Sequence, residues 1–138
     1  MTSGFRPLGL DHVVLRVSDV AAMISFYCEV VGCTVEKIQA DFGLTQLRAG
    51  SALIDLVDVS GPLGRMGGAA PGADARNMDH FCLRIDPWEE DAIRAHLGAY
   101  GITVGDSGQR YGAEGVGPSI YVTDPEDNVV ELKGPPSG

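Results

Sequence analysis

The stretch LDHVVLRV at residues 10–17 returns as MDHFCLRI at residues 78–85. Asp, His, Leu and Arg occupy matching places in the two copies. Both stretches alternate and are rich in β-branched or aromatic side chains, which is typical of a β-strand. The chain therefore contains one strand twice, and we expect the elements around it to be duplicated as well.

The segments that follow the two strands also correspond. Apolar residues at helical spacing predict a helix over residues 20–31, with Ser18 and Asp19 as caps and Gly32 at its end. A second helix is predicted over residues 88–100, and Gly101 ends it in the same way. Each copy thus begins with a strand followed by a helix that a glycine terminates.

Three further strands are expected in each copy. They are predicted at residues 33–39, 43–49 and 52–59, and again at residues 102–104, 119–123 and 128–133. The fold class is therefore α+β, with two tandem βαβββ modules at about 8–60 and 76–134. A connection at 61–77, rich in Gly, Ala and Pro, joins them. The chain 1–138 is expected to form a single domain with a pseudo-twofold arrangement and a shared cleft.

The composition excludes several classes of function. The 138 residues include 19 acidic and 10 basic ones, and the formal charge is −9. Binding to nucleic acid or to an anionic membrane needs a basic surface, so neither partner is expected. No stretch approaches the ~20 apolar residues of a transmembrane helix. Three cysteines without CxxC spacing fit core packing in a reducing compartment, and a cytoplasmic location is expected.

Four residues at equivalent positions of the two modules form a candidate metal site. His12 and His80 occupy the same place in the two first strands. Asp55, in LIDLVD, and Glu131, in VVELKG, occupy the same place in the two last strands. Imidazoles and carboxylates together are a ligand set for a divalent transition metal such as Ni, Zn, Mn, Co or Fe. Such an ion acidifies bound water and polarises carbonyl or enolate oxygens.

Strand parity adds two arginines to the candidate cleft. Residues 12, 14 and 16 share one face of their strand, as do residues 80, 82 and 84. Arg16 and Arg84 should therefore point into the cleft together with the histidines. Each arginine could bind a substrate anion, or pair with one of the many acidic residues.

These motifs resemble the vicinal oxygen chelate superfamily. The resemblance covers about residues 8–134 and includes LDHVVLRVSDV, FYCEVVGC, ALIDL, MDHFCLRI and SIYVTDPEDNVVEL. It implies an open mixed β-barrel around a metal cleft, with His12, Asp55, His80 and Glu131 as the ligands. It also implies a small-molecule substrate and, because most members are homodimers, a homodimeric assembly.

Within that superfamily the order of the ligands is similar to that of glyoxalase I. The resemblance implies a metal-bound carboxylate, Glu131 or Asp55, that shuttles a proton between two carbons while the metal holds an enediolate. Arg16 matches an arginine that meets a substrate carboxylate in that enzyme. Asp55 departs from the pattern, because glyoxalase I has Glu or Gln there and Asp is one methylene shorter.

Two alternatives follow from other parts of the resemblance. If Asp55 does not reach the metal, three ligands remain, as in extradiol dioxygenases and fosfomycin-modifying enzymes. In the latter, a Gly-rich loop, a Ser and a Tyr lie near the phosphonate, and the matching positions are 112–117, Ser119 and Tyr121. A hairpin turn and ordinary strand residues would explain the same positions. The remaining alternative is a metal-free protein that binds a drug such as bleomycin.

Overall fold

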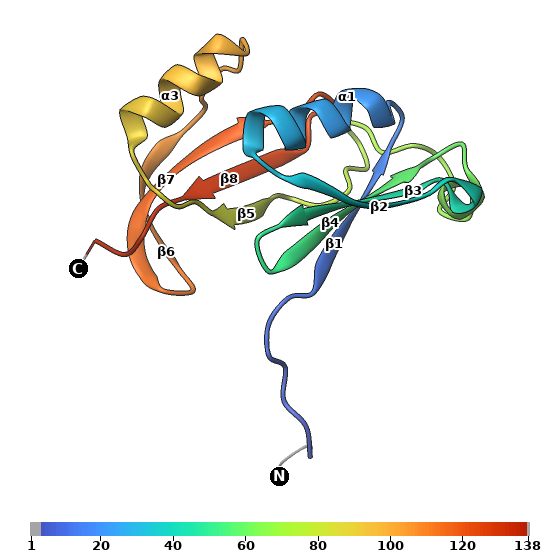
Figure 1. Cartoon of the computed structure of the whole chain (residues 1–138), viewed down its shortest axis with the longest axis horizontal. Coiled ribbons are helices and arrows are strands. Elements are labelled where there is room, and N and C mark those ends of the chain that lie inside the picture. Colours follow the sequence, from blue (N-terminus) through green and yellow to red (C-terminus); the bar gives the residue numbers. More distant parts are fainter. Residues whose placement is uncertain (1–3, 138) are drawn as a thin grey trace.

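The duplicated sequence folds into two four-stranded sheets of identical topology (Figure 1). A computed structural model describes residues 4–137. The first sheet has the order β1-β4-β3-β2 and the second has the order β5-β8-β7-β6. The strands are β1 (His12–Val17), β2 (Thr34–Gln39), β3 (Leu44–Ala49), β4 (Ala52–Asp58), β5 (Phe81–Arg84), β6 (Ser107–Gly112), β7 (Gly115–Thr123) and β8 (Val129–Lys133).

The register of the two sheets explains the repeat. β1 runs parallel to β4, and β5 runs parallel to β8, while the other pairs are antiparallel. Val14 lies opposite Asp55 in the first sheet, and Cys82 lies opposite Glu131 in the second. The predicted α+β class with two βαβββ modules is confirmed. The two sheets remain separate and do not close into a barrel.

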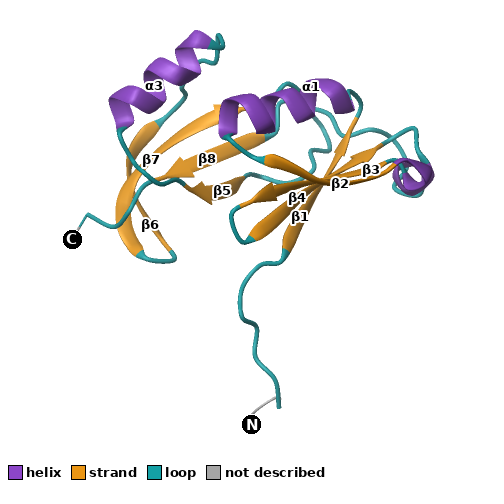
Figure 2. Ribbon diagram, viewed as in Figure 1, coloured by secondary structure: helices purple, strands orange, loops and turns teal. Residues whose placement is uncertain are grey.

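The two helices labelled α1 and α3 lie on the same side of the two sheets (Figure 2). The helical segments are α1 (Val20–Ser25), a π-helical turn η1 (Phe26–Val31), a short turn η2 (Ala40–Phe42), α2 (Pro62–Arg65) and α3 (Glu90–Ala99). Asp19 caps α1 by accepting from the Ala22 amide at 3.1 Å, and Gly32 ends η1 with φ 98°. Within residues 4–137, no helix is long and apolar enough to span a membrane.

Strand parity divides the sheets into a core face and a polar face. The core contains alternate strand residues and the inner sides of α1, η1 and α3: Leu15, Val17, Met23, Phe26, Tyr27, Leu47, Ile54, Leu56, Leu97, Ile120, Val122, Val130 and Leu132. The intervening strand residues project to the other face because successive side chains alternate. On β1, Leu15 and Val17 lie in the core and Val13 packs against it, as expected when residues 12, 14 and 16 share the other face.

A buried aspartate organises the turn between β7 and β8. Asp124 accepts hydrogen bonds from the amides of Glu126 and Asn128, at 2.8 and 3.0 Å. It also accepts from the Asn128 side chain at 2.8 Å and from the Tyr27 hydroxyl at 2.7 Å. The DPEDN motif is therefore a turn whose carboxylate ties the second sheet to η1.

Two expectations about the second module are wrong. Residues 102–104 form no strand, although Ile102 and Val104 pack against the core. The strand of that region is β6, whose sequence SGQRYG contains two glycines and little apolar character. Cys82 does not contribute to the core either, because it is exposed on β5, whereas Cys33 is buried.

Candidate metal centre

The first sheet brings together His12 and Asp55. His12 Nε2 lies 4.0 Å from Asp55 Oδ2, and Asp55 is 5% exposed. Gln46 Nε2 lies 3.3 Å from each oxygen of the Asp55 carboxylate. On its other side the His12 ring meets Asp11, with Nδ1 2.8 Å from Oδ1. This set of contacts orients His12 Nε2 toward Asp55.

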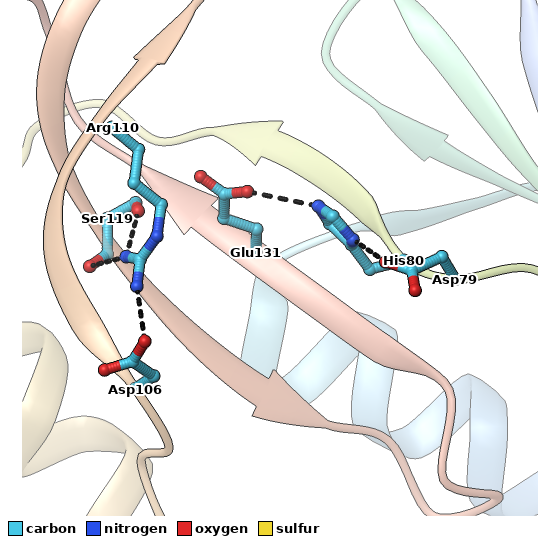
Figure 3. Close-up of polar contacts among 6 residues, drawn as sticks. All are labelled: Asp79, His80, Asp106, Arg110, Ser119 and Glu131. Carbon is cyan, nitrogen blue, oxygen red and sulfur yellow. Dashed lines mark hydrogen bonds and ion pairs between the residues drawn. The ribbon is translucent and has the colours of Figure 1, made fainter.

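The second sheet repeats the arrangement more tightly (Figure 3). His80 Nε2 lies 3.3 Å from Glu131 Oε1, and Glu131 is 7% exposed. His80 Nδ1 lies 2.5 Å from Asp79 Oδ2. The ring of Tyr121 meets the His80 ring edge to face, with 5.3 Å between the centroids. Each predicted histidine is thus held between a preceding aspartate and the predicted carboxylate ligand.

The donor atoms of both pairs suit a divalent transition metal. Two ligands that are each ~2.1 Å from a tetrahedral ion lie roughly 3.4 Å apart. The 3.3 Å between His80 and Glu131 matches this separation, whereas the 4.0 Å between His12 and Asp55 exceeds it. A carboxylate on the outer ring nitrogen is also the usual support for a metal-binding histidine. His80 and Glu131 therefore fit a metal more closely than His12 and Asp55 do.

The four predicted ligands do not form one cluster within the chain. Among residues 4–137, no group of three or more His, Cys, Asp and Glu is arranged to hold a metal ion. His12 and His80 both line one cavity of about 420 Å³ between β1 and β5, but the carboxylates do not line it. One chain therefore carries two separate His–carboxylate pairs, His12 with Asp55 and His80 with Glu131, which are called half-sites below.

Charge and burial set the protonation of these groups. The hydrogen bond to Asp11 and the charge of Asp55 raise the pKa of His12 above its ordinary value. A proton and a metal ion therefore compete for His12 below neutral pH. Around Glu131, desolvation and the glutamate charge raise the pKa of Tyr121, and they raise the pKa of Cys82 to about 11. Both groups stay protonated beside Glu131 at neutral pH.

Arg16 has other partners than the expected substrate anion. Its guanidinium donates to the backbone carbonyls of Gly64, Gly68 and Ala69, at 2.9, 2.8 and 3.0 Å. A Cβ on Gly67 would lie 2.6 Å from the guanidinium carbon, so this glycine allows the loop to approach. Arg16 therefore fastens the connection at residues 61–77 to β1.

The other predicted substrate-binding residues lie on the polar face of the second sheet. Arg84 donates to Glu114 at 2.7 Å. Of the two alternatives predicted for Arg84, a substrate anion or an acidic residue, the structure shows the second. Ser119 is buried, and its Oγ lies 2.7 Å from Arg110 Nη1 (Figure 3). The Arg110 guanidinium also stacks over the Tyr121 ring at 4.6 Å. Residues 112–115 form the turn of the β6–β7 hairpin.

Several residues of the two half-sites were not among the sequence predictions. Asp11 and Asp79 contact the histidines. The Asp-His pair that occurs in both copies of the repeated strand could have identified them. Lys133 shares a strand face with Glu131, two residues away, and the same parity that selected Arg84 could have found it. Arg110 was missed as a candidate site residue because β6 has few apolar side chains and no strand was predicted there.

Comparisons with solved structures show the same fold in proteins of different roles. A virulence protein from Salmonella typhimurium is 25% identical, with a TM-score of 0.77 over 95% of this chain and 99% of that one. A lactoylglutathione lyase from Agrobacterium tumefaciens is 24% identical, with a TM-score of 0.67 over 93% and 94% of the two chains. An antibiotic-binding protein from Streptomyces sp. CB03234 is 22% identical, with a TM-score of 0.66 over 95% and 98%.

The family assignment rests on a match along nearly the whole chain. Residues 9–132 match the sequence model of the Glyoxalase/Bleomycin resistance protein/Dioxygenase superfamily. The matched segment includes both half-sites and all eight strands but the last residue of β8. The chain therefore belongs to this superfamily.

Proposed function

We propose that the protein is a metal-dependent lyase or isomerase of the glyoxalase type that acts on a small molecule with adjacent oxygens. The observation that carries the proposal is the pair of repeated His–carboxylate contacts, each supported by an aspartate on the outer ring nitrogen. Three free cysteines support the proposed cytoplasmic location, because thiols stay reduced in that compartment.

The metal site is proposed to form between two copies of the chain. Each half-site supplies two ligands, which is fewer than the three protein ligands of a typical catalytic zinc site. If the His12–Asp55 half-site of one copy faces the His80–Glu131 half-site of another, a dimer contains two sites of up to four ligands. The polar sheet face that neither α1 nor α3 covers is available for this pairing (Figure 1).

In the proposed reaction the metal and Glu131 have different roles. When bound, the metal polarises a coordinated substrate oxygen and so acidifies the adjacent C–H group. Glu131 is the proposed general base, taking a proton at a carboxylate oxygen and returning it to the neighbouring carbon. Protonated Tyr121 and Cys82 flank this carboxylate and do not compete as bases.

A proton-transfer assay tests this function. The hemithioacetal of methylglyoxal and glutathione is the probe, and the protein is loaded separately with Ni²⁺ or Zn²⁺. We expect turnover that requires the metal, and a loss of about 10²–10⁴-fold in Glu131→Gln, which keeps the side-chain shape but removes the base. Glu126→Gln, away from the half-sites, is the control. Equal turnover by Glu131→Gln and the native protein would contradict the role of Glu131.

A three-ligand site of the dioxygenase or fosfomycin type is the second candidate function. It is favoured by the longer His12–Asp55 separation and by the Gln46 amide that already occupies both Asp55 oxygens. The proposed four-ligand site predicts that Asp55→Ala lowers metal affinity by about tenfold or more. Equilibrium titration against a chromogenic chelator measures this change. Unchanged affinity would favour the three-ligand site, and oxygen uptake with catechols or fosfomycin turnover would then separate the two activities.

A further inference from the structure

We propose that Lys133 binds an oxyanion group of the substrate, in a small cavity beside Glu131. This inference rests on the proposed function, because it assigns a substrate class to the same site. The substrate would be a small molecule that carries a carboxylate, phosphonate or phosphate a few bonds away from its reacting carbons. Lys133 follows Glu131 by two residues on β8, so the two side chains share a face at a spacing of roughly 7 Å.

Burial without a partner is the first observation. Lys133 is 7% exposed, whereas Lys37, the other lysine of the chain, is exposed on β2. Within residues 4–137, the Lys133 side chain has neither a hydrogen bond nor an ion pair, and its Nζ keeps some contact with solvent. Lysine is almost never fully buried unless it is paired, because an ammonium group loses its hydration on burial. An anion from outside the described chain would supply the missing partner.

Two glycines of the β6–β7 hairpin make room for this side chain. A Cβ on Gly112 would lie 2.6 Å from Cε of Lys133. A Cβ on Gly117 would lie 2.4 Å from the Pro135 carbonyl oxygen and 3.0 Å from Nζ of Lys133. Larger residues at these positions would displace the lysine. Gly112 therefore makes room for the Lys133 side chain, and Gly117 makes room for both the lysine and the Pro135 backbone.

The cavity that Lys133 lines contains two cationic side chains and two carboxylates. It has a volume of about 230 Å³ and is lined by β5, β8 and the hairpin, including Cys82, Arg84, Glu114, Glu131 and Lys133. Arg84 and Glu114 neutralise each other at 2.7 Å. Glu131 faces His80 at 3.3 Å and is the proposed metal ligand. With Glu131 assigned to the proposed metal, the charge of Lys133 is the one that remains for a bound anion.

Anion binding to matched lysine variants tests the proposal. Inorganic phosphate and acetate are the probes, titrated by calorimetry into metal-free and metal-loaded protein at constant ionic strength. Lys133→Met keeps an unbranched side chain but removes the charge, and we expect it to weaken anion binding by about 10–100-fold. Lys37→Met should bind the anions like the native protein. Stronger binding of phosphate or of acetate would identify the preferred oxyanion.

A pair of glycine variants provides a second test, which does not require Lys133→Met to fold. Gly112→Ala should displace the amine and weaken anion binding, while Gly108→Ala, with its nearest contact at 4.0 Å, should not. Equal affinity in Lys133→Met and the native protein, or no anion binding by the native protein, would overturn the proposal. Metal content is measured in every sample. A native protein that binds anions through Lys133 but holds no metal would refute the proposed function and leave the anion site intact.

Discussion

His80→Ala is expected to remove the metal ion from the protein. In the proposed site the imidazole is one of the two donors of the tighter half-site, 3.3 Å from Glu131 and in contact with Asp79. Loss of supporting residues alone typically costs about 10–100-fold in metal affinity, so loss of a ligand should cost ~100-fold or more. Elemental analysis after dialysis, together with a chelator competition titration, measures the change.

The third histidine provides the matched control for this variant. His96 lies on α3 with Nε2 2.9 Å from the Val30 carbonyl oxygen, on the helical side of the molecule. His96→Ala should therefore keep the native metal content. Similar metal content in His80→Ala and the native protein, with both folded by circular dichroism, would rule out His80 as a ligand.

Asp124→Ala should cause a large loss of stability, although Asp124 lies outside the half-sites. The substitution removes four hydrogen bonds and leaves the Tyr27 hydroxyl, in a fully buried residue, without its partner. Burial raises the pKa of Asp124, so its carboxylate depends on these donors. Each buried unsatisfied group costs about 1–3 kcal/mol, and we expect a total loss of roughly 3–4 kcal/mol in the free energy of unfolding.

Urea unfolding measures this loss against an exposed aspartate. Asp41→Ala, in the η2 turn, should change the free energy of unfolding by less than ~0.5 kcal/mol. If Asp124→Ala unfolded at the same urea concentration as Asp41→Ala, the DPEDN turn would not be the link between η1 and the second sheet. While they remain folded, the two variants are expected to have the same metal content.

The repeated strand was the most informative part of the sequence. Its alternation fixed which side chains of β1 and β5 enter the core, and the structure confirms that division. The helix ends at Gly32 and Gly101 were predictable because both residues adopt positive φ. The strand β6 was not, since SGQRYG has no apolar alternation and is held by pairing with β7.

The arrangement of the candidate site was less predictable than its residues. Sequence repetition predicted that His12, Asp55, His80 and Glu131 meet in one shared cleft. The structure forms each His–carboxylate pair within a module, because β1 pairs with β4 and β5 pairs with β8. Whether the pairs meet depends on how modules or copies face each other, and no local pattern in the sequence encodes that.

Mixing two half-site variants tests this account most directly. His12→Ala and His80→Ala are co-expressed, purified together and analysed for metal per chain. A dimer with one copy of each variant has one intact site, so random pairing should restore about a quarter of the native metal content. Each variant expressed alone should hold almost none. No recovery in the mixed sample, or full metal content in either single variant, would contradict a site formed between two copies.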